Sequence, residues 1–306
     1  MKKKIYLITG STGFIGSRLI DYLVSIDCNI RLLARKNNPD IETIICDFEK
    51  DTIPKSALDS VHTIIHLAGI AHDFRNQCQT EKLYNSVNID FTIKLAKLAS
   101  KNRVSRFLFI SSVKAGGVPS SGRCGSEKEQ SFPSDIYGKT KREAESQLIQ
   151  IGRESEMHIS IIRPALVYGP EVKGNLKLMM LGVKKGWFPP LPKVENKKSM
   201  IHVDDLVNAI FLVANSRHNC GEIFIATDGS PYSAREIYEC MCIIAQKPIP
   251  KWTVPKAIFN IMSFISPSIK YKVDKLLANE YYSSSKLEFL GFKPKKTLKD
   301  MNEASF

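Results

Sequence analysis

The chain has 306 residues, of which 43% are hydrophobic and 25% are charged, the composition of a globular protein large enough for a full core. Lys and Arg outnumber Asp and Glu by 44 to 31, and this net charge of +13 fits anionic ligands, a membrane surface or nucleic acid. The lysines are spread along the chain without an arginine-rich arm, so we expect no nucleic-acid partner.

The first predicted strand, Ile5–Thr9, runs directly into the sequence TGSTGFIG and a helix. Three glycines spaced three apart between a buried strand and a helix are the pattern of a dinucleotide site. Gly10 allows the tight turn, Gly13 lets the backbone approach a pyrophosphate, and Gly16 lets the helix pack closely on the strand. The helix amino terminus then presents free N–H groups to the phosphates. The candidate cofactor-binding residues of this turn are Gly10, Thr12, Gly13, Phe14, Ile15 and Gly16.

Strand-like runs alternate with helical patterns through the first half of the chain. This order predicts an α/β fold, a Rossmann-type doubly wound parallel sheet covered by helices on both faces. The expected strands are Ile5–Thr9, Asn29–Ala34, Thr43–Cys46, Thr63–Ala68, Arg106–Ser111 and Ile159–Arg163, with helices near 14–26, 85–101 and 138–154. In such a sheet ligands bind beyond the carboxyl ends of the strands, so the residues that follow each strand are the candidates for chemistry.

After Arg163-Pro164 the pattern loosens into loops and short elements. We expect a nucleotide-binding domain and a smaller C-terminal substrate-binding subdomain, covering 1–168 and 169–198 with 229–306 respectively. Residues 199–228 are expected to return to the first domain as a strand, a helix and a strand, at Ser199–Val203, 204–216 and Glu222–Ala226.

The strand ends indicate how the cofactor is chosen and held. NAD-specific sheets usually place Asp or Glu after the second strand for the ribose 2′-hydroxyl, but Arg35 stands here and favours the 2′-phosphate of NADP. A solvated basic loop is the alternative. After the third strand, Asp47 and Phe48 are the candidates to cap adenine. After the fourth strand, Leu67, Ala68 and Gly69 are expected to let the backbone pass the cofactor closely.

The fifth strand runs into Ser111-Ser112, and Tyr137 and Lys141 follow on a helix, four residues apart and so on one face. A phenol with an ordinary pKa of about 10 is a poor acid–base group at pH 7. A neighbouring ammonium and an oxidised nicotinamide would both stabilise the phenolate and lower that pKa. The Ser112 hydroxyl could hydrogen-bond a substrate carbonyl oxygen. A Tyr-x-x-x-Lys pair is common by chance, so its weight comes from the serine and the glycine turn.

Together these residues resemble the extended short-chain dehydrogenase/reductase family, in its branch of NAD-dependent nucleotide-sugar epimerases, dehydratases and reductases. The resemblance covers essentially the whole chain, and its marks are TGSTGFIG, HLAG at 66–69, Asn88 in NIDFT, SSV at 111–113, YGKTK at 137–141, RPALVYGP at 163–170 and IHVDDL at 201–206. It implies that Ser112, Tyr137 and Lys141 form the catalytic triad. Asn88 would support the active-site helix and a water linked to the lysine, and Arg163 and Pro164 would flank the nicotinamide.

The substrate half, GWFPPLPKVENKKSMIHVDDL, resembles bacterial 4-keto sugar reductases and 4-epimerases of surface-polysaccharide synthesis. That resemblance implies that Lys198 binds the substrate diphosphate and that Asn175 contacts the nucleotide sugar. Arginine is commoner at position 198, and lysine gives a point charge without the bidentate fork. HLAG also departs from the usual HLAA of the family.

The resemblance therefore implies NADP-dependent reduction of the 4-keto group of a UDP-linked, N-acetylated 6-deoxy hexose. A UDP-glucose or UDP-N-acetylglucosamine 4-epimerase with retained NAD is the first alternative, and a non-catalytic NADP-sensing protein is a remote one. A 4,6-dehydratase is not expected, because Val113-Lys114 stands where those enzymes place Asp-Glu. Family members often dimerise through helices such as those near 85–101 and 138–154, so we expect a homodimer.

Seven cysteines show neither metal-ligand spacing nor a paired framework, so we expect no metal site and reduced thiols in a cytoplasmic protein. The Lys2-Lys3-Lys4 run enters a strand at once, which argues against a signal peptide. No apolar run reaches the roughly 18 residues of a membrane span. The basic 247–275 region could touch an anionic leaflet or be plain surface. His66 and His202, on apolar strands, are expected to be satisfied core residues.

Overall fold

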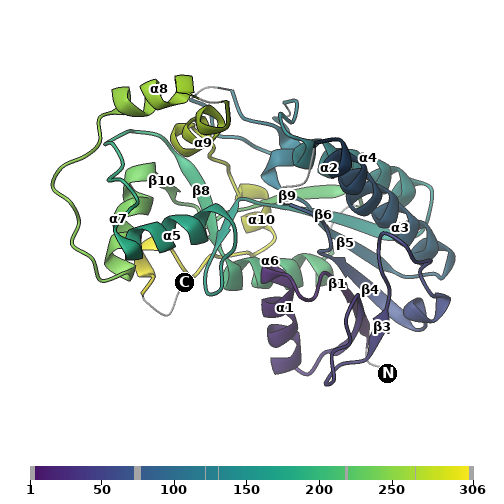
Figure 1. Cartoon of the computed structure of the whole chain (residues 1–306). Coiled ribbons are helices and arrows are strands. Elements are labelled where there is room, and N and C mark those ends of the chain that lie inside the picture. Colours follow the sequence, from purple (N-terminus) through teal and green to yellow (C-terminus); the bar gives the residue numbers. More distant parts are fainter. Residues whose placement is uncertain are drawn as a thin grey trace.

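The computed structural model describes residues 4–71, 77–120, 122–129, 131–217, 220–265 and 267–302. Within these ranges the strands form two sheets (Figure 1). The larger sheet is parallel throughout, in the order β3-β2-β1-β4-β5-β6-β9. Its strands are β1 (Ile5–Thr9), β2 (Asn29–Ala34), β3 (Thr43–Ile45), β4 (Val61–His66), β5 (Arg106–Ile110), β6 (His158–Pro164) and β9 (Glu222–Ala226). The predicted doubly wound parallel sheet is confirmed.

Helices cover both faces of this sheet, because its central strands are apolar on both sides. One face is covered by α1 (Phe14–Ser25) and α6 (Val203–Asn215), whose leucines, isoleucines and valines pack on Ile8 and Ile65. The other face is covered by α3 (Thr92–Lys101) and α4 (Ile136–Arg153). Figure 1 shows the two layers on opposite sides of the strands. The sheet is therefore buried between two separate apolar clusters.

The strand order reverses between β1 and β4, which lie side by side at the centre of the sheet. Chain segments leaving the carboxyl ends of these two strands diverge, and ligands of doubly wound sheets bind in the resulting crevice. The glycine turn follows β1, and the loop Leu67 to Ile70 follows β4. The pairing of β4 with β1 ends at His66, so β4 lies two residues earlier than the expected Thr63–Ala68.

The rest of the chain builds a third apolar cluster around a smaller sheet in the order β10-β8-β7. Its strands are β7 (Leu166–Tyr168), β8 (Lys198–His202) and β10 (Pro231–Tyr232). The helices of this half are α5 (Asn175–Lys185), α7 (Ala234–Ile244), α8 (Lys256–Ile265), α9 (Pro267–Leu277) and, on the large-sheet side, α10 (Ser285–Phe289). Of the segment expected to return to the first domain, α6 and β9 pack with the large sheet, whereas β8 pairs in the small one.

The helix expected at 85–101 is longer than predicted and is not uniform. It begins as α2 (Gln77–Tyr84), continues through a π-helical turn at Asn85–Phe91, and ends as α3. The helical segment therefore begins at Gln77, eight residues earlier than expected, and residues 72–76 lie outside the described ranges. Within those ranges no helix is both long and apolar enough to cross a bilayer.

Candidate active site

The glycine turn after β1 is built by backbone contacts that leave no space for side chains. Gly10 has φ +74°, a left-handed conformation, and a Cβ there would lie 2.7 Å from the backbone nitrogen of Ala68. A Cβ on Gly16 would overlap the carbonyl oxygen of Gly10. Helix α1 can therefore start directly against the turn. These are the roles that the spacing predicts for the first and third glycines.

The amino terminus of α1 fits the phosphates of a dinucleotide. Gly13 is its N-cap, no side chain caps it, and its first turn carries no acidic residue. The free N–H groups and the positive end of the helix dipole are left to interact with an anion.

At the end of β5, the buried Ser111 hydroxyl finds no hydrogen-bond partner within the described part of the chain. Such an atom is normally satisfied by water or ligand.

The predicted trio of Ser112, Tyr137 and Lys141 is brought together beside this edge of the sheet. Ser112 follows β5 and caps the 3₁₀ turn Val113–Gly116, and its side chain interacts with the Tyr137 phenol and lowers the pKa of that group. The Lys141 ammonium lies 6.0 Å from the centre of the Tyr137 ring. It donates a hydrogen bond of 2.9 Å to the carbonyl oxygen of Ile110, the last residue of β5. One strand end and one helix face thus hold all three groups.

Burial shifts the pKa of both ionisable members of the trio toward their neutral forms. Burial raises the pKa of Tyr137 above the ordinary value, with Asp135 and Tyr84 adding to this and the Ser112 hydrogen bond opposing it. The pKa of Lys141 is lowered by burial to about 8. In the protein alone the phenol is therefore a proton donor at neutral pH. The lowering that we expected for its pKa needs the positive charge of an oxidised cofactor.

Lys141 also touches the loop that follows β4, and this loop touches the glycine turn. A Cβ on Gly69 would lie 3.2 Å from the Lys141 Nζ atom, and Ala68 adjoins Gly10. The loop that contains Ala68 and Gly69 therefore connects the trio with the glycine turn. Sequence spacing cannot reveal this proximity, since 131 positions separate Gly10 and Lys141 in the numbering.

Asn88 lies in the π-helical turn and is fully buried. Its side-chain oxygen accepts a hydrogen bond from the Ile70 backbone N–H at 2.8 Å, and its amide nitrogen donates to the Ile70 carbonyl and to the Thr140 hydroxyl. Asn88 therefore joins the loop after β4 to the helix that carries Tyr137 and Lys141. π-Helical turns are often found at functional sites.

His66 holds the strands beneath the site, as expected of a satisfied core histidine. One ring nitrogen lies 2.6 Å from the Thr9 hydroxyl and the other 2.8 Å from the Thr92 hydroxyl. Complete burial and the nearby Lys141 lower its pKa to about 3, so the ring is neutral at physiological pH. His202 caps α6 by accepting from the backbone N–H of Asp204.

Three charged residues near the trio were not predicted. Glu145, one turn beyond Lys141, forms a buried two-bond ion pair with Arg163. Lys114 pairs with Asp135 at 2.6 Å, and its ammonium lies 5.8 Å from the centre of the Tyr137 ring. Glu145 was recoverable from the four-residue helical spacing after Lys141. The Lys114 contact was not, because its partner comes from another element.

Four of the expected ligand-contacting side chains have positions that bear on their roles. Arg163 was expected to flank the nicotinamide. Its guanidinium is buried in an ion pair with Glu145, so it is not available to contact a cofactor in this structure. Arg35 is exposed at the end of β2. Phe48 stacks on Phe91 with ring centres 4.0 Å apart, while Asp47 accepts a bond from the Glu49 N–H.

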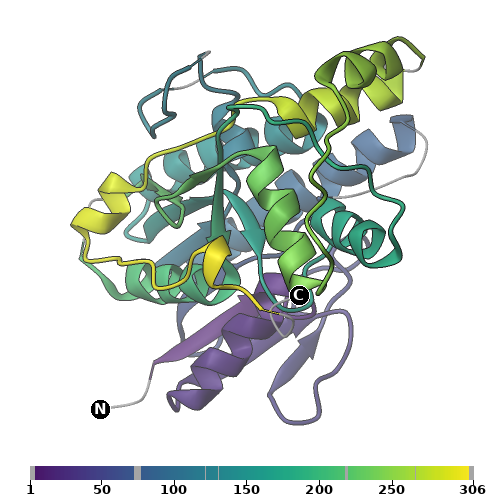
Figure 2. The same ribbon diagram turned by 90° about the vertical axis from the view of Figure 1, so that its left-hand side faces the viewer.

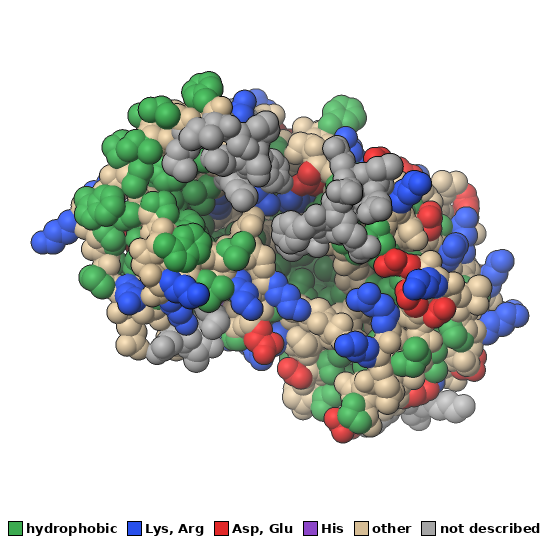
Figure 3. All heavy atoms as spheres, in the orientation of Figure 1, with side chains coloured by type: hydrophobic (Ala, Val, Ile, Leu, Met, Phe, Trp, Pro, Cys, Tyr) green, Lys and Arg blue, Asp and Glu red, His purple; other side chains and the backbone are tan. Residues whose placement is uncertain are grey.

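The two expected substrate contacts lie in the second half of the chain. Lys198 is buried, and its ammonium donates 2.7 Å to the Lys275 carbonyl oxygen and lies 3.9 Å from a Glu280 oxygen. Burial lowers the pKa of Lys198. Asn175 is exposed at the first position of α5. In Figure 3 the surface is hollowed between the half that carries α1 to α4 and the half that carries α5, α7 and α8.

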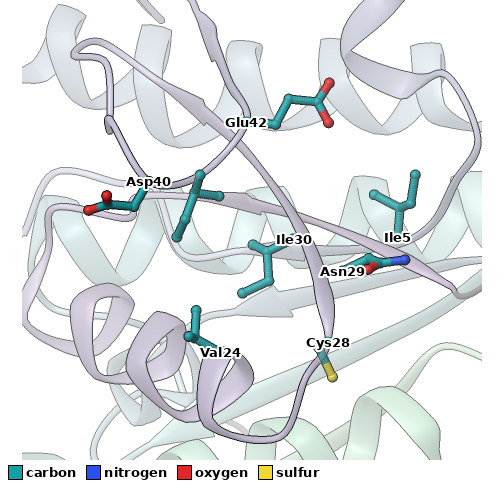
Figure 4. Close-up of a pocket in the computed structure, with 8 residues that line it drawn as sticks. Ile5, Val24, Cys28, Asn29, Ile30, Asp40 and Glu42 are labelled. Carbon is teal, nitrogen blue, oxygen red and sulfur yellow. The ribbon is translucent and has the colours of Figure 1, made fainter.

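A pocket elsewhere is unrelated to this constellation. It is lined by residues at the amino ends of β1 and β2 and in the turn before β3, including Ile5, Asn29 and Glu42 (Figure 4). That is the edge of the sheet opposite to the glycine turn. The Glu42 carboxylate on its rim is paired with Arg31 at 2.7 Å. The pocket is therefore remote from Ser112, Tyr137 and Lys141.

Comparison with known proteins places these residues in context. The pattern of the NAD dependent epimerase/dehydratase family matches residues 6–226. The chain is 32% identical to a UDP-glucose 4-epimerase of Vibrio cholerae over 97% of its own length and 93% of the relative. It is 26% identical to N-acetyl-alpha-D-glucosaminyl-diphospho-ditrans,octacis-undecaprenol 4-epimerase of Escherichia coli O157:H7, over 94% and 89%. A UDP-glucuronic acid 4-epimerase of Bacillus cereus in complex with NAD has the same fold, with a TM-score of 0.80 at 19% identity, over 98% and 96%.

Proposed function

Because this chain belongs to the NAD dependent epimerase/dehydratase family, we propose that it is an NADP-dependent oxidoreductase acting at C4 of a UDP-linked sugar. The substrate proposed is a 4-keto, N-acetylated 6-deoxy hexose, and the net reaction is reduction of its 4-keto group. The observation that carries this proposal is the meeting of Ser112 at the end of β5 with Tyr137 and Lys141 on one face of α4.

Each of these side chains has a distinct part in the proposed reaction. The glycine turn would hold the phosphates of a nicotinamide cofactor, which would supply the hydride for the keto carbon. Tyr137 donates its proton to the carbonyl oxygen, a role that suits a phenol whose pKa is raised by burial. Ser112 donates a hydrogen bond to the same oxygen and polarises it. Lys141, fixed by the Ile110 carbonyl, supplies a positive charge close to the phenol.

The Tyr137→Phe variant tests this mechanism. We expect turnover to fall by about 10²- to 10⁴-fold while NADPH binding, followed by fluorescence titration, stays unchanged. The assay follows NADPH absorbance with UDP-4-keto sugars as substrates. Full activity in the phenylalanine variant would remove Tyr137 from the chemistry.

NADP is proposed over NAD because Arg35 is exposed after β2, where its guanidinium is available to a 2′-phosphate. Arg35→Ala should weaken NADPH binding about tenfold or more and leave NADH binding nearly unchanged. The matched control is Arg153→Ala, which removes an exposed arginine at the end of α4. An equal loss for both cofactors would contradict the assignment.

A UDP-sugar 4-epimerase is the second candidate, favoured by the 32% identity to an enzyme of that name. It uses the same side chains, but the cofactor is oxidised and reduced within one cycle. The two reactions differ in stoichiometry: a reductase consumes one NADPH per product, and an epimerase consumes none. Product formation from a UDP-hexose without added NADPH would establish the epimerase and displace the reductase.

We also propose that the protein is a homodimer. The helices expected to form its interface, α3 and α4, pack against each other on one face of the sheet. Their arrangement leaves an outer surface that a second copy can cover. Light scattering after size-exclusion chromatography measures the mass directly, and a mass of one chain would contradict this part of the proposal.

A further inference from the structure

The half of the molecule that carries α5, α7 and α8 has an unusual surface. Hydrophobic side chains gather over it, with basic ones along its edge and acidic ones mostly on the other half (Figure 3). Among its members, Phe264 is 90% exposed, Trp252 64%, Ile261 63% and Trp187 60%. Exposed apolar side chains at this density mark a surface that contacts something other than water.

The segments that carry these side chains are distant in sequence but lie next to each other in the folded protein. The Val254 backbone N–H donates to the Pro190 carbonyl oxygen at 3.0 Å, which holds the segments that carry Trp187 and Trp252 together. Ile258, Ile261 and Phe264 share the outer face of α8, because they are three residues apart, while Phe259 is buried. Phe259 packs in the same apolar cluster as Met180 of α5. In both ribbon views α8 and α9 stand at an outer corner of the molecule (Figures 1 and 2).

The two chain segments that form this surface carry basic residues and no acidic ones. Residues 172–194 contain five lysines and no acidic residue, and so do residues 240–273. Lys177, Lys184, Lys251 and Lys256 are among the exposed ones. Lysine stems lie along apolar surface while their ammonium groups reach toward charge at its edge. Aromatic side chains with lysines around them are the composition of a surface that lies on an anionic bilayer.

We propose that this face, formed by α5, α8 and the segments that carry Trp187 and Trp252, docks on the surface of an anionic phospholipid membrane. Trp252, Ile261 and Phe264 enter the headgroup region, and the lysines contact anionic lipid headgroups. Charge complementarity favours a bilayer over a second copy of this chain, since two such faces would oppose lysine to lysine. The inference is independent of the reaction at the carboxyl edge of the large sheet.

The two tryptophans of the chain, Trp187 and Trp252, both lie in this face, so intrinsic fluorescence reports docking directly. The experiment uses the full chain with two kinds of vesicle. One is phosphatidylcholine alone, and the other contains about 30% phosphatidylglycerol, which is anionic. We expect a blue shift of emission and co-sedimentation with the anionic vesicles only, both reduced by about 0.5 M NaCl. No shift, or equal binding to both vesicles, would overturn the proposal.

Variants locate the contact. Phe264→Ser with Ile261→Ser should abolish co-sedimentation, whereas Phe289→Ser should not. Phe289 is 93% exposed but lies on α10, outside the face. Lys251→Ala and Lys256→Ala should each weaken binding by about fivefold. These side chains are exposed, so an unchanged melting temperature checks that each variant folds. If the double serine variant changes the oligomeric mass while wild type ignores vesicles, the face is a protein interface and the membrane proposal falls.

Discussion

A Cβ atom on Gly69 would lie 3.2 Å from Nζ of Lys141 and 3.2 Å from the side-chain oxygen of Asn88. The loop after β4 therefore packs against both the proposed catalytic lysine and the residue that holds its helix. This loop also adjoins Gly10, so one short segment joins the glycine turn to the proposed catalytic groups. The size of residue 69 controls this junction.

Substitutions at Gly69 test the junction. Gly69→Ala brings a methyl group to 3.2 Å from two flexible polar atoms, which need to move by only a few tenths of an ångström. We expect kcat to stay within about threefold and the melting temperature to change little. Gly69→Val adds bulk that the site cannot absorb, at about 1–3 kcal/mol of stability, and should lower kcat at least about tenfold. If the valine variant is fully active, the contact does not position Lys141.

Asn88 makes three hydrogen bonds that join the loop to α4. Asn88→Ala leaves the partly buried Ile70 backbone groups without their Asn88 partner, which should reduce the free energy of unfolding by about 1–3 kcal/mol and lower kcat. Asn85→Ala, at an exposed asparagine of the same π-helical turn, is the matched control and should change neither. Urea denaturation and steady-state kinetics measure both effects. Equal losses in the two variants would mean that the turn, and not the Asn88 contacts, matters.

Burial of Lys141 costs stability at a proposed catalytic position. Its pKa is lowered from 10.5 to about 8, so the folded protein binds this proton less tightly than the unfolded chain. This difference corresponds to roughly 3 kcal/mol against the charged form at pH 7, and it fades as pH rises from 8 to 10.5. Lys141→Met should therefore be more stable than wild type by about 1–3 kcal/mol at pH 7, less the lost bond to Ile110, and inactive.

The pH dependence of the stability difference between wild type and Lys141→Met checks this prediction. Denaturation of both proteins at pH 7 and at pH 10 should show that the advantage of the methionine variant shrinks at the higher pH. An advantage that grows with pH would contradict the shift, and so would a methionine variant that is less stable throughout.

The Glu145–Arg163 ion pair joins α4 to the end of β6 in the protein interior. Glu145→Ala removes one partner of a buried pair, and we expect a loss of about 3–5 kcal/mol. Replacing both residues, as Glu145→Leu with Arg163→Met, should recover most of that loss, because no buried charge then remains. Chemical denaturation measures both. A double variant as unstable as the single one would show that the pair does more than balance charge.

Local pattern was enough for the large sheet and for the shared helix face of Tyr137 and Lys141. The strands β1, β2 and β9 lie where their apolar runs predict, because strands buried on both faces are hydrophobic throughout. Tyr137 and Lys141 share a face because four residues make about one helical turn. The π-helical turn was missed because its sequence, NSVNIDF, differs in no local way from an ordinary helix.

The sequence by itself determined the glycine turn, the parallel sheet and the residue types at the strand ends, since each follows from local residue patterns and from the alternation of strands with helices. Only the tertiary structure decided that Lys141 meets Gly69, that Arg163 is engaged by Glu145, and that Lys198 is held by the Lys275 carbonyl. It also decided that Trp187 and Trp252 share one exposed face. These contacts join distant or separately folded elements, and their distances depend on how whole helices and sheets pack.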